Sequence, residues 1–229
     1  TTVSIDILPV TNTTDGLHFA TIQAAIDAST TETGDVIEVC QGTYMESVVV
    51  NKSIHLKGKT GEVNNTFIMA PSTLPNTSTQ ESYIIKVSGA AVSAEISELT
   101  IKGPGPGGCG TIGYGILVRD AANANIHNNK IIDVRDQPFS GCQNGIAIQV
   151  GRQAWSTTGT ATITNNIISG YQKNGITVDN TGSNAIITGN IITGAGTTPT
   201  IAQNGLQVSR GATATVTGNT ITGNSFHLT

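Results

Sequence analysis

One short phrase occurs four times at a spacing of 30 residues: Tyr114-Gly115-Ile116, Asn144-Gly145-Ile146, Asn174-Gly175-Ile176 and Asn204-Gly205-Leu206. A second phrase lies between and after these copies, as Ile126-His127-Asn128-Asn129, Ile163-Thr164-Asn165-Asn166, Ile187-Thr188-Gly189-Asn190 and Val216-Thr217-Gly218-Asn219. A repeat of this length is typical of architectures in which each unit buries its apolar face only by stacking on its neighbours. The sequence therefore predicts a solenoid.

Each repeat alternates apolar and more polar residues, the pattern of short strands with one buried side. The apolar positions after the repeated glycine are Ile116/Val118, Ile146/Ile148, Ile176/Val178 and Leu206/Val208. A second alternating strand precedes the asparagine of the second phrase. A third follows it, with Ile131, Ile168, Ile192 and Ile221 at equivalent positions. Since no helical pattern separates these strands, we expect them to stack in parallel as a β-helix.

The asparagines of the second phrase should occupy one corner of successive coils: Asn129, Asn166, Asn190 and Asn219. Asparagine tolerates the left-handed backbone conformation, and its amide can bond to the asparagines above and below it. An ordinary loop role would explain each asparagine alone, but not the shared register of all four. The sequence therefore predicts an asparagine ladder.

The N-terminal segment indicates a family. Residues 19–28 have helical spacing and are predicted to form a short amphipathic helix. Short apolar strands follow at residues 34–39, 42–44, 46–50 and 52–58. Residues 18–58 resemble the opening of right-handed parallel β-helix proteins of the pectin-lyase-like superfamily, and the start of pectin methylesterases in particular. The resemblance implies coils of three strands with the ladder between the second and third, and a helix that plugs the N-terminal end.

We therefore expect an all-β protein, a right-handed parallel β-helix capped by a short N-terminal α-helix. It should be one domain over residues 1–229, with a cap and first coil at 1–58, irregular coils with long loops at 59–112 and regular repeats at 113–229. Nothing like the N-terminal helix covers the last coil. We therefore expect a longer chain or an assembly, with self-association through the C-terminal coil at Phe226 and Leu228.

Composition favours a secreted or cell-surface protein. Charged residues make up 11% of the chain, aromatic residues 4%, and the net charge is −4. No dense basic patch is present, which argues against a nucleic-acid partner. No apolar stretch is long enough for a transmembrane segment.

The three cysteines allow one disulfide. Cys109 and Cys142 lie six and three residues before the repeated glycines and enter adjacent coils from the same corner, so we predict a bridge between them with Cys40 free. Cysteine, histidine and carboxylate spacings typical of metal sites are absent, and no cofactor is expected. The scattered histidines are expected to be surface residues rather than ligands: His18, His55, His127 and His227.

A candidate binding surface lies on the strand that follows the repeated glycine. Its outward positions are expected to stack as Arg119, Gln149, Asp179 and Ser209, beside Leu117, Ala147, Thr177 and Gln207. A loop with Arg152 and Trp155 and a loop with Asp136 flank this strand. Polar groups can bond sugar hydroxyls while an indole stacks on the ring. The superfamily resemblance places saccharide clefts on the same face. The predicted substrate-binding residues are Arg119, Gln149, Asp179, Arg152, Trp155 and Asp136.

No catalytic residues are assigned. Residues 150–155, Val-Gly-Arg-Gln-Ala-Trp, only partly match the Leu-Gly-Arg-Pro-Trp block of pectin methylesterases, and the other catalytic blocks of the superfamily do not occur. We favour a module that binds polysaccharide or serves as an adhesin or stalk. One alternative is a polysaccharide lyase or carbohydrate esterase acting on an acidic glycan. Another is an ice-binding or filament-forming surface of Thr-x-Thr strands at 160–164 and 213–217.

Overall fold

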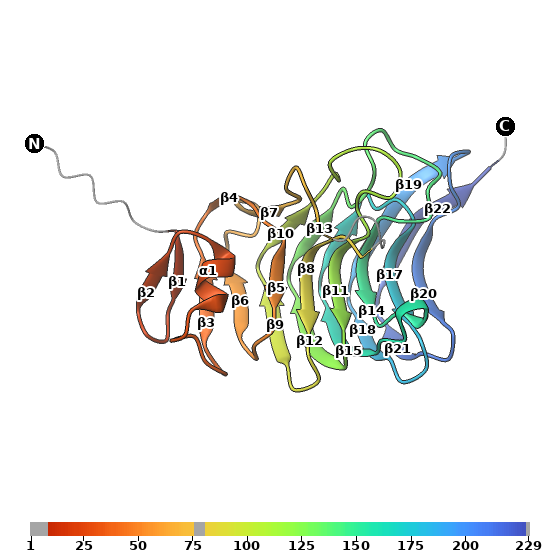
Figure 1. Cartoon of the computed structure of the whole chain (residues 1–229). Coiled ribbons are helices and arrows are strands. Elements are labelled where there is room, and N and C mark those ends of the chain that lie inside the picture. Colours follow the sequence, from red (N-terminus) through yellow and green to blue (C-terminus); the bar gives the residue numbers. More distant parts are fainter. Residues whose placement is uncertain (1–8, 76–80, 228–229) are drawn as a thin grey trace, which may run out of the picture.

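The computed structural model describes residues 9–75 and 81–227, which wind into a stack of coils that runs from left to right in Figure 1. Each complete coil gives one strand to each of three sheets, and successive coils pair in parallel. The all-β solenoid predicted from the repeats is confirmed.

The nine-stranded sheet has the order β2 (Leu17–Phe19), β1 (Val10–Asn12), β3 (Val36–Val39), β6 (His55–Gly58), β9 (Ser93–Ser97), β12 (Ala122–His127), β15 (Gly159–Thr164), β18 (Asn184–Thr188), β21 (Thr213–Thr217). The seven-stranded sheet has the order β22 (Thr220–Phe226), β19 (Ile191–Thr198), β16 (Ile167–Ser169), β13 (Lys130–Ile132), β10 (Thr100–Lys102), β7 (Thr66–Met69), β4 (Gly42–Met45). The six-stranded sheet has the order β20 (Asn204–Ser209), β17 (Asn174–Asp179), β14 (Ile146–Val150), β11 (Tyr114–Arg119), β8 (Tyr83–Ser88), β5 (Val48–Val50).

Columns of identical or similar apolar side chains fill the interior of the coil. In the nine-stranded sheet the register aligns Ile96, Ile126, Ile163 and Ile187, all with no exposed surface. Because neighbouring rungs lie about 4.8 Å apart, each isoleucine packs on the next along the axis. The alternating pattern of the sequence thus becomes continuous apolar stacks.

A helix and a hairpin close the N-terminal end of the stack (Figure 1). The strands β1 and β2 form an antiparallel hairpin, and β1 also pairs antiparallel with β3. Helix α1 (Ile22–Asp27) buries Ile22, Ala25 and Ile26, and the side chain of Thr21 caps its first turn. The predicted helical cap is confirmed, with the helix shorter than the 19–28 expected.

The register of one coil differs from the prediction. The repeated glycines are not all equivalent, because Ile116 pairs with Ile148 and Ile148 pairs with Ile176. Gly145 instead lies before the strand with φ +73°, a left-handed conformation that suits glycine. The paired residues Ile116 and Ile148 are 32 residues apart and Ile148 and Ile176 are 28 apart, so the average spacing of 30 hides the shift.

The asparagine ladder forms between the nine-stranded and seven-stranded sheets. The Nδ2 atoms of Asn129, Asn166 and Asn190 donate to the Oδ1 atoms of the next ladder asparagine at 3.1, 3.0 and 2.9 Å. The left-handed conformation belongs to the residue before each ladder position, namely Asn128, Asn165, Gly189 and Gly218. The ladder residues themselves therefore contribute their amides, and the preceding residues make the corner.

Residues 59–112 contain strands β7, β8, β9 and β10. Glu98 and Leu99 separate β9 from β10, and Glu98 has φ +57°. Both strands pair in register with the neighbouring coils. At the far end, the last coil leaves apolar side chains partly exposed: Val208, Val216, Ile221 and Phe226. Leu228 lies outside the described residues. The described part of the chain contains no helix of the length and hydropathy needed to cross a membrane.

Candidate functional site

A polar pocket of about 210 Å³ lies on the outer face of the six-stranded sheet. Strands β14, β17 and β20 form its floor, and the loop that follows β14 forms one side. The lining residues are Gln143, Ile146, Gln149, Arg152, Ala154, Lys173, Asn174, Thr177, Asp179, Gln207 and Arg210. The lining therefore carries three basic side chains and one carboxylate among the residues that the structure describes.

The carboxylate of Asp179 holds the walls of the pocket together. Its Oδ2 accepts from the backbone N–H of Gln153 at 3.0 Å, and its Oδ1 accepts from Ser209 Oγ at 2.8 Å and Arg210 Nη1 at 3.0 Å. Burial alone would raise the pKa of Asp179, but these donors outweigh it, so the pKa is lowered from 3.8. The side chain is ionised at neutral pH, and only 2% of it is exposed.

Arg152 lies between the pocket and an aromatic cluster. Its guanidinium is 4.4 Å from the ring centre of Trp155 and 5.7 Å from that of Tyr114. Burial lowers the pKa of Arg152, Asp179 opposes this shift and Arg210 adds to it. The arginine still carries its charge at neutral pH. Asp179 thus pairs directly with Arg210 and acts on Arg152 only through longer-range attraction.

Trp155 belongs to a short 3₁₀ turn, η2 (Gln153–Trp155), and packs outside the core. Its ring meets Tyr114 edge-on at 5.9 Å and contacts a cluster with Leu117. Arg119 lies over the same ring at 5.4 Å. The indole therefore packs against arginine and tyrosine side chains and does not line the pocket.

The structure separates Arg119 from the pocket. Its guanidinium pairs with Glu81 and, at 3.0 Å, with Asp120. The register places Arg119 in one column with Gly151, Asp179 and Ser209, whereas Gln149 stacks between Leu117 and Thr177. The predicted column Arg119–Gln149–Asp179 is wrong by two positions at Gln149, because of the register shift at Gly145.

Amide side chains form the floor of the pocket. Asn174 donates to Thr177 Oγ1 at 2.8 Å and to Gln207 Oε1 at 3.0 Å, and Asn204 donates to Asn174 Oδ1 at 3.0 Å. Gln149 donates to the carbonyl of Gly151. These bonds fix the orientations of the amides, so the floor presents ordered donors and acceptors.

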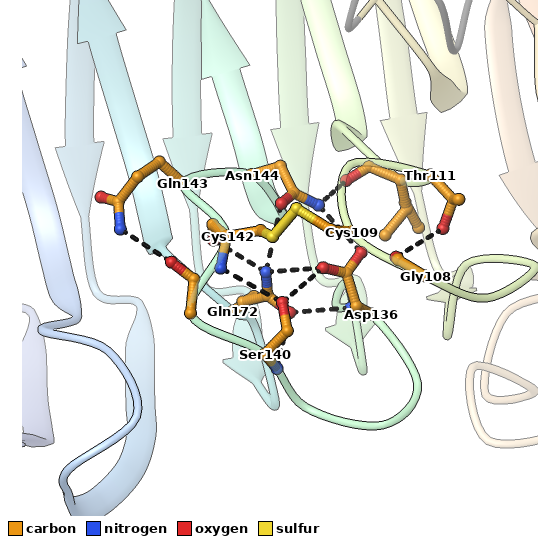
Figure 2. Close-up of a disulfide and its surroundings, with 11 residues drawn as sticks. Gly108, Cys109, Thr111, Asp136, Ser140, Cys142, Gln143, Asn144 and Gln172 are labelled. Atoms are coloured by element: carbon orange, nitrogen blue, oxygen red, sulfur yellow. Dashed lines mark hydrogen bonds between the residues drawn. A yellow bond between two sulfur atoms is a disulfide. The ribbon is translucent and has the colours of Figure 1, made fainter.

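A disulfide organises the loop at the other end of β14, as Figure 2 shows. Cys109 and Cys142 are bridged with their Cα atoms 5.7 Å apart, the pairing that the repeat predicts, and Cys40 is the free cysteine of the described residues. Asp136 is fully buried beside the bridge. It accepts from Ser140 at 2.7 Å, Gln172 at 2.9 Å and Asn144 at 3.0 Å.

Asp136 therefore lies in the loop and does not line the pocket. Gln172 acts beside it as the central residue of the loop, since its Oε1 accepts from the backbone of Asp136 and its Nε2 donates to the carbonyl of Cys142. Gln143 follows the bridge, points away from it in Figure 2 and lines the pocket. The disulfide loop thus supports one side of the site.

Of the six predicted residues, the structure brings Gln149, Arg152 and Asp179 to the pocket, places Trp155 against its wall, and leaves Arg119 and Asp136 outside. Sequence reasoning missed Lys173, Asn174 and Arg210. The asparagine was visible in the repeated phrase, where it precedes the glycine. Arg210 directly follows the outward Ser209 at the corner after β20, a position that the stacking pattern could have included.

Comparison with known proteins supports the architecture. Residues 46–226 match the family described as right handed beta helix region. The chain belongs to this family. The right-handed β-helix predicted from the sequence is thus confirmed for this β-helix protein. A search of curated proteins found no match.

Two solved structures resemble this β-helix protein at low identity. One is a pectin methylesterase in complex with hexasaccharide VII, with 16% identity, 86% of this chain covered and a TM-score of 0.49. The other is a point mutant of pectin methylesterase in complex with hexasaccharide IV, with 15% identity, the same coverage and a TM-score of 0.44. The β-helix protein spans 64% of the length of each of these chains.

Proposed function

We propose that this β-helix protein binds an acidic glycan at the pocket on the six-stranded sheet. The observation that carries the proposal is the charge balance of the lining, which holds the basic side chains of Arg152, Lys173 and Arg210 but a single carboxylate, that of Asp179. Two positive charges remain uncompensated, although the whole chain has a net charge of −4. A uronic acid carboxylate would supply the missing negative charge, because guanidinium groups bind carboxylates with strong, oriented hydrogen bonds.

The floor of the pocket supplies uncharged polar groups that could bind the sugar ring. The amides of Gln149, Asn174 and Gln207 and the hydroxyl of Thr177 can bond sugar hydroxyls. The cavity of about 210 Å³ is smaller than the range of roughly 300–1,000 Å³ typical of pockets that enclose a drug-sized ligand. It suits one sugar unit, with the rest of the glycan lying along the outer face of the coils.

The lining supports binding rather than hydrolysis. Both oxygens of Asp179 already accept hydrogen bonds, and the lining offers no second carboxylate or histidine among the described residues. A lyase or esterase acting on an acidic glycan is the alternative. Product analysis after long incubation with the glycan separates the two, since release of unsaturated ends or methanol would establish catalysis.

A titration with matched sugars tests the binding proposal. A galacturonic acid oligomer and its fully methyl-esterified form differ only at the carboxyl groups, where the ester carries a methyl group in place of the negative charge. We expect calorimetry to show binding of the acid and binding at least about fivefold weaker for the ester, since loss of one charged hydrogen bond costs ~1 kcal/mol or more. Equal affinity for the two oligomers would contradict the proposal.

A pair of lysine variants tests whether the glycan binds at this pocket. Lys173 donates from Nζ to the carbonyl of Ala202 at 2.7 Å, which holds it at the pocket wall. We expect Lys173→Gln to weaken binding of the acid by about fivefold. Lys59→Gln removes the same charge from an exposed corner near the N-terminal end and should leave affinity unchanged. Equal losses in the two variants would indicate only long-range attraction.

We also propose that the protein is secreted or held at the cell surface. The Cys109–Cys142 disulfide supports this, because such bonds persist in oxidising compartments. Fractionation of the native host, with thiol labelling of the protein in each fraction, tests the proposal. Oxidised protein outside the cytoplasm is expected, and reduced protein confined to the cytoplasm would contradict it.

Self-association through the last coil is a separate proposal. Val208, Val216, Ile221 and Phe226 are each 40–46% exposed, an apolar surface that a second copy would cover. Light scattering should show a dimer or larger species that Phe226→Asp dissociates. The threonine surface is less favoured, because Asn184 and Ile186 interrupt its columns.

A further inference from the structure

Two histidines and a glutamate converge on the outer face of the nine-stranded sheet. His55, Glu95 and His127 belong to β6, β9 and β12, three successive rungs. His55 pairs directly with Glu95 in the register, and His127 lies beside Ser97 on the next rung. In the sequence the two histidines are far apart and are expected to be surface residues. The parallel stacking brings together residues separated by 40 and 32 positions.

The three side chains have the spacing of ligands around one ion. The Nε2 of His127 is 2.7 Å from Glu95 Oε1, and the Nε2 of His55 is 3.4 Å from the same oxygen. All three potential ligand atoms lie within 4.8 Å of one another. Ligands bound at ~2.1 Å to a tetrahedral ion lie ~3.4 Å apart, so small side-chain adjustments would complete the arrangement.

The neighbouring cation is engaged elsewhere, which leaves the carboxylate to the histidines. Lys57, two residues along β6, is paired with Glu38 at 3.6 Å and so is drawn away from Glu95. The carboxylate thus faces two imidazoles.

We propose that His55, Glu95 and His127 bind a divalent transition metal ion of the zinc class. Two imidazole nitrogens and one carboxylate oxygen are a donor set that such ions prefer, and Ca²⁺ or Mg²⁺ would require more oxygen ligands. The side chains are 25%, 38% and 23% exposed, so an ion can enter from solvent and keep a water ligand. Backbone pairing on a rigid sheet holds the three ligands in place.

Ser97 is the group that an ion would displace. Its hydroxyl lies 2.7 Å from the Nε2 of His55, the same atom that faces the site. Coordination by this nitrogen breaks that hydrogen bond, and the hydroxyl must turn away. A second group of potential ligands, Cys109, Asp136 and Cys142, offers no comparable site because both of its sulfurs are in the disulfide.

Calorimetric titration of the chelator-treated protein with Zn²⁺ alone tests the proposal. The free thiol of Cys40 could also bind zinc, so every protein in the series carries Cys40→Ser. We expect one ion per chain, a rise in the unfolding temperature with Zn²⁺, and no comparable effect of Mg²⁺.

The ligand variants are His55→Gln, Glu95→Gln and His127→Gln, and the matched control is His18→Gln on the N-terminal hairpin. Each ligand variant should lose at least about tenfold in Zn²⁺ affinity, since even outer partners of a metal site cost 10–100-fold. The control should bind like its parent. Absence of Zn²⁺ binding by the parent, or full affinity in any of the three ligand variants, would overturn the proposal.

Discussion

Arg210 Nη1 donates to Asp179 Oδ1 at 3.0 Å and so links the corner after β20 to the end of β17 on the preceding coil. The carboxylate is buried, whereas the arginine side chain is 58% exposed. The same carboxylate also accepts from the backbone of the turn that carries Trp155. One buried acid therefore connects two coils and a surface loop.

Asp179→Asn should destabilise the protein in a pH-dependent way. The folded-state pKa of Asp179 is lowered from 3.8, so its ionised form contributes stability above that value and loses it as pH falls through the folded pKa. We expect a loss of about 1–3 kcal/mol at neutral pH that shrinks as the pH falls below 3.8, measured by urea unfolding. Asp15→Asn, in the exposed N-terminal loop, should cost less than ~0.5 kcal/mol. A loss that does not change with pH would contradict the role of the charge.

Trp155→Ala should weaken glycan binding although the ring does not line the pocket. The variant removes the indole ring against which the guanidinium of Arg152 packs, so that guanidinium is less well positioned. The expected loss is on the order of 1 kcal/mol, about fivefold in affinity. Thr217→Ala on β21 serves as the control and should bind normally. Equal affinity of both variants would indicate that Arg152 needs no support from the indole.

Non-reducing peptide mapping should recover the peptide pair joined by Cys109 and Cys142, with Cys40 alkylated before reduction. The bridge closes a loop with a sequence separation of 33, for which loop entropy predicts about 4 kcal/mol at most. We expect the Cys109→Ser/Cys142→Ser variant to lose less than this limit, because Asp136 and Gln172 hold the same loop. Free thiols at both positions, or a bridge to Cys40, would refute the pairing.

Asn166→Ala should be one of the most destabilising single changes in the ladder. It removes the shared acceptor of the backbone N–H and Nδ2 of Asn129, both buried. Unsatisfied buried donors cost about 1–3 kcal/mol each, so we expect a loss of about 2–4 kcal/mol in chemical denaturation. Asn125→Ala changes an exposed asparagine on β12 and should alter stability by less than ~0.5 kcal/mol. Similar losses in both variants would argue against the ladder as the cause.

The coil could be predicted from the sequence because every turn must bury apolar side chains at the same strand positions. Ile131, Ile168, Ile192 and Ile221 pair as expected. The position of Gly145 could not be predicted. A glycine at a corner and a glycine facing the core look alike in sequence, and only the left-handed φ of Gly145 distinguishes it from Gly115.

The candidate surface could be predicted in outline but not in its pairings. The outward face of the six-stranded sheet carries the polar pocket, but it also carries an apolar cluster with Tyr114 and Leu117. Arg119 pairs with Glu81, which lies 38 residues earlier and outside the repeated phrases. Lys173 and Arg210 enter the pocket from corners, where the alternation of inward and outward positions gives no guide. Contacts made by residues in the corner loops therefore cannot be predicted from the alternation along the strands.

The asparagine ladder gives the coil a direction. Asn129, Asn166 and Asn190 each donate from Nδ2 to the Oδ1 of the next ladder asparagine, and the same Nδ2 also donates to a carbonyl of the preceding coil. With alanine at position 166 the backbone N–H there can still serve Asn190 Oδ1, whereas the backbone N–H of Asn129 loses its acceptor and the Nδ2 of Asn129 keeps only the carbonyl of Ile96. The loss therefore falls more heavily on the N-terminal side of the substitution, and we expect faster amide exchange at Asn129 than at Asn190.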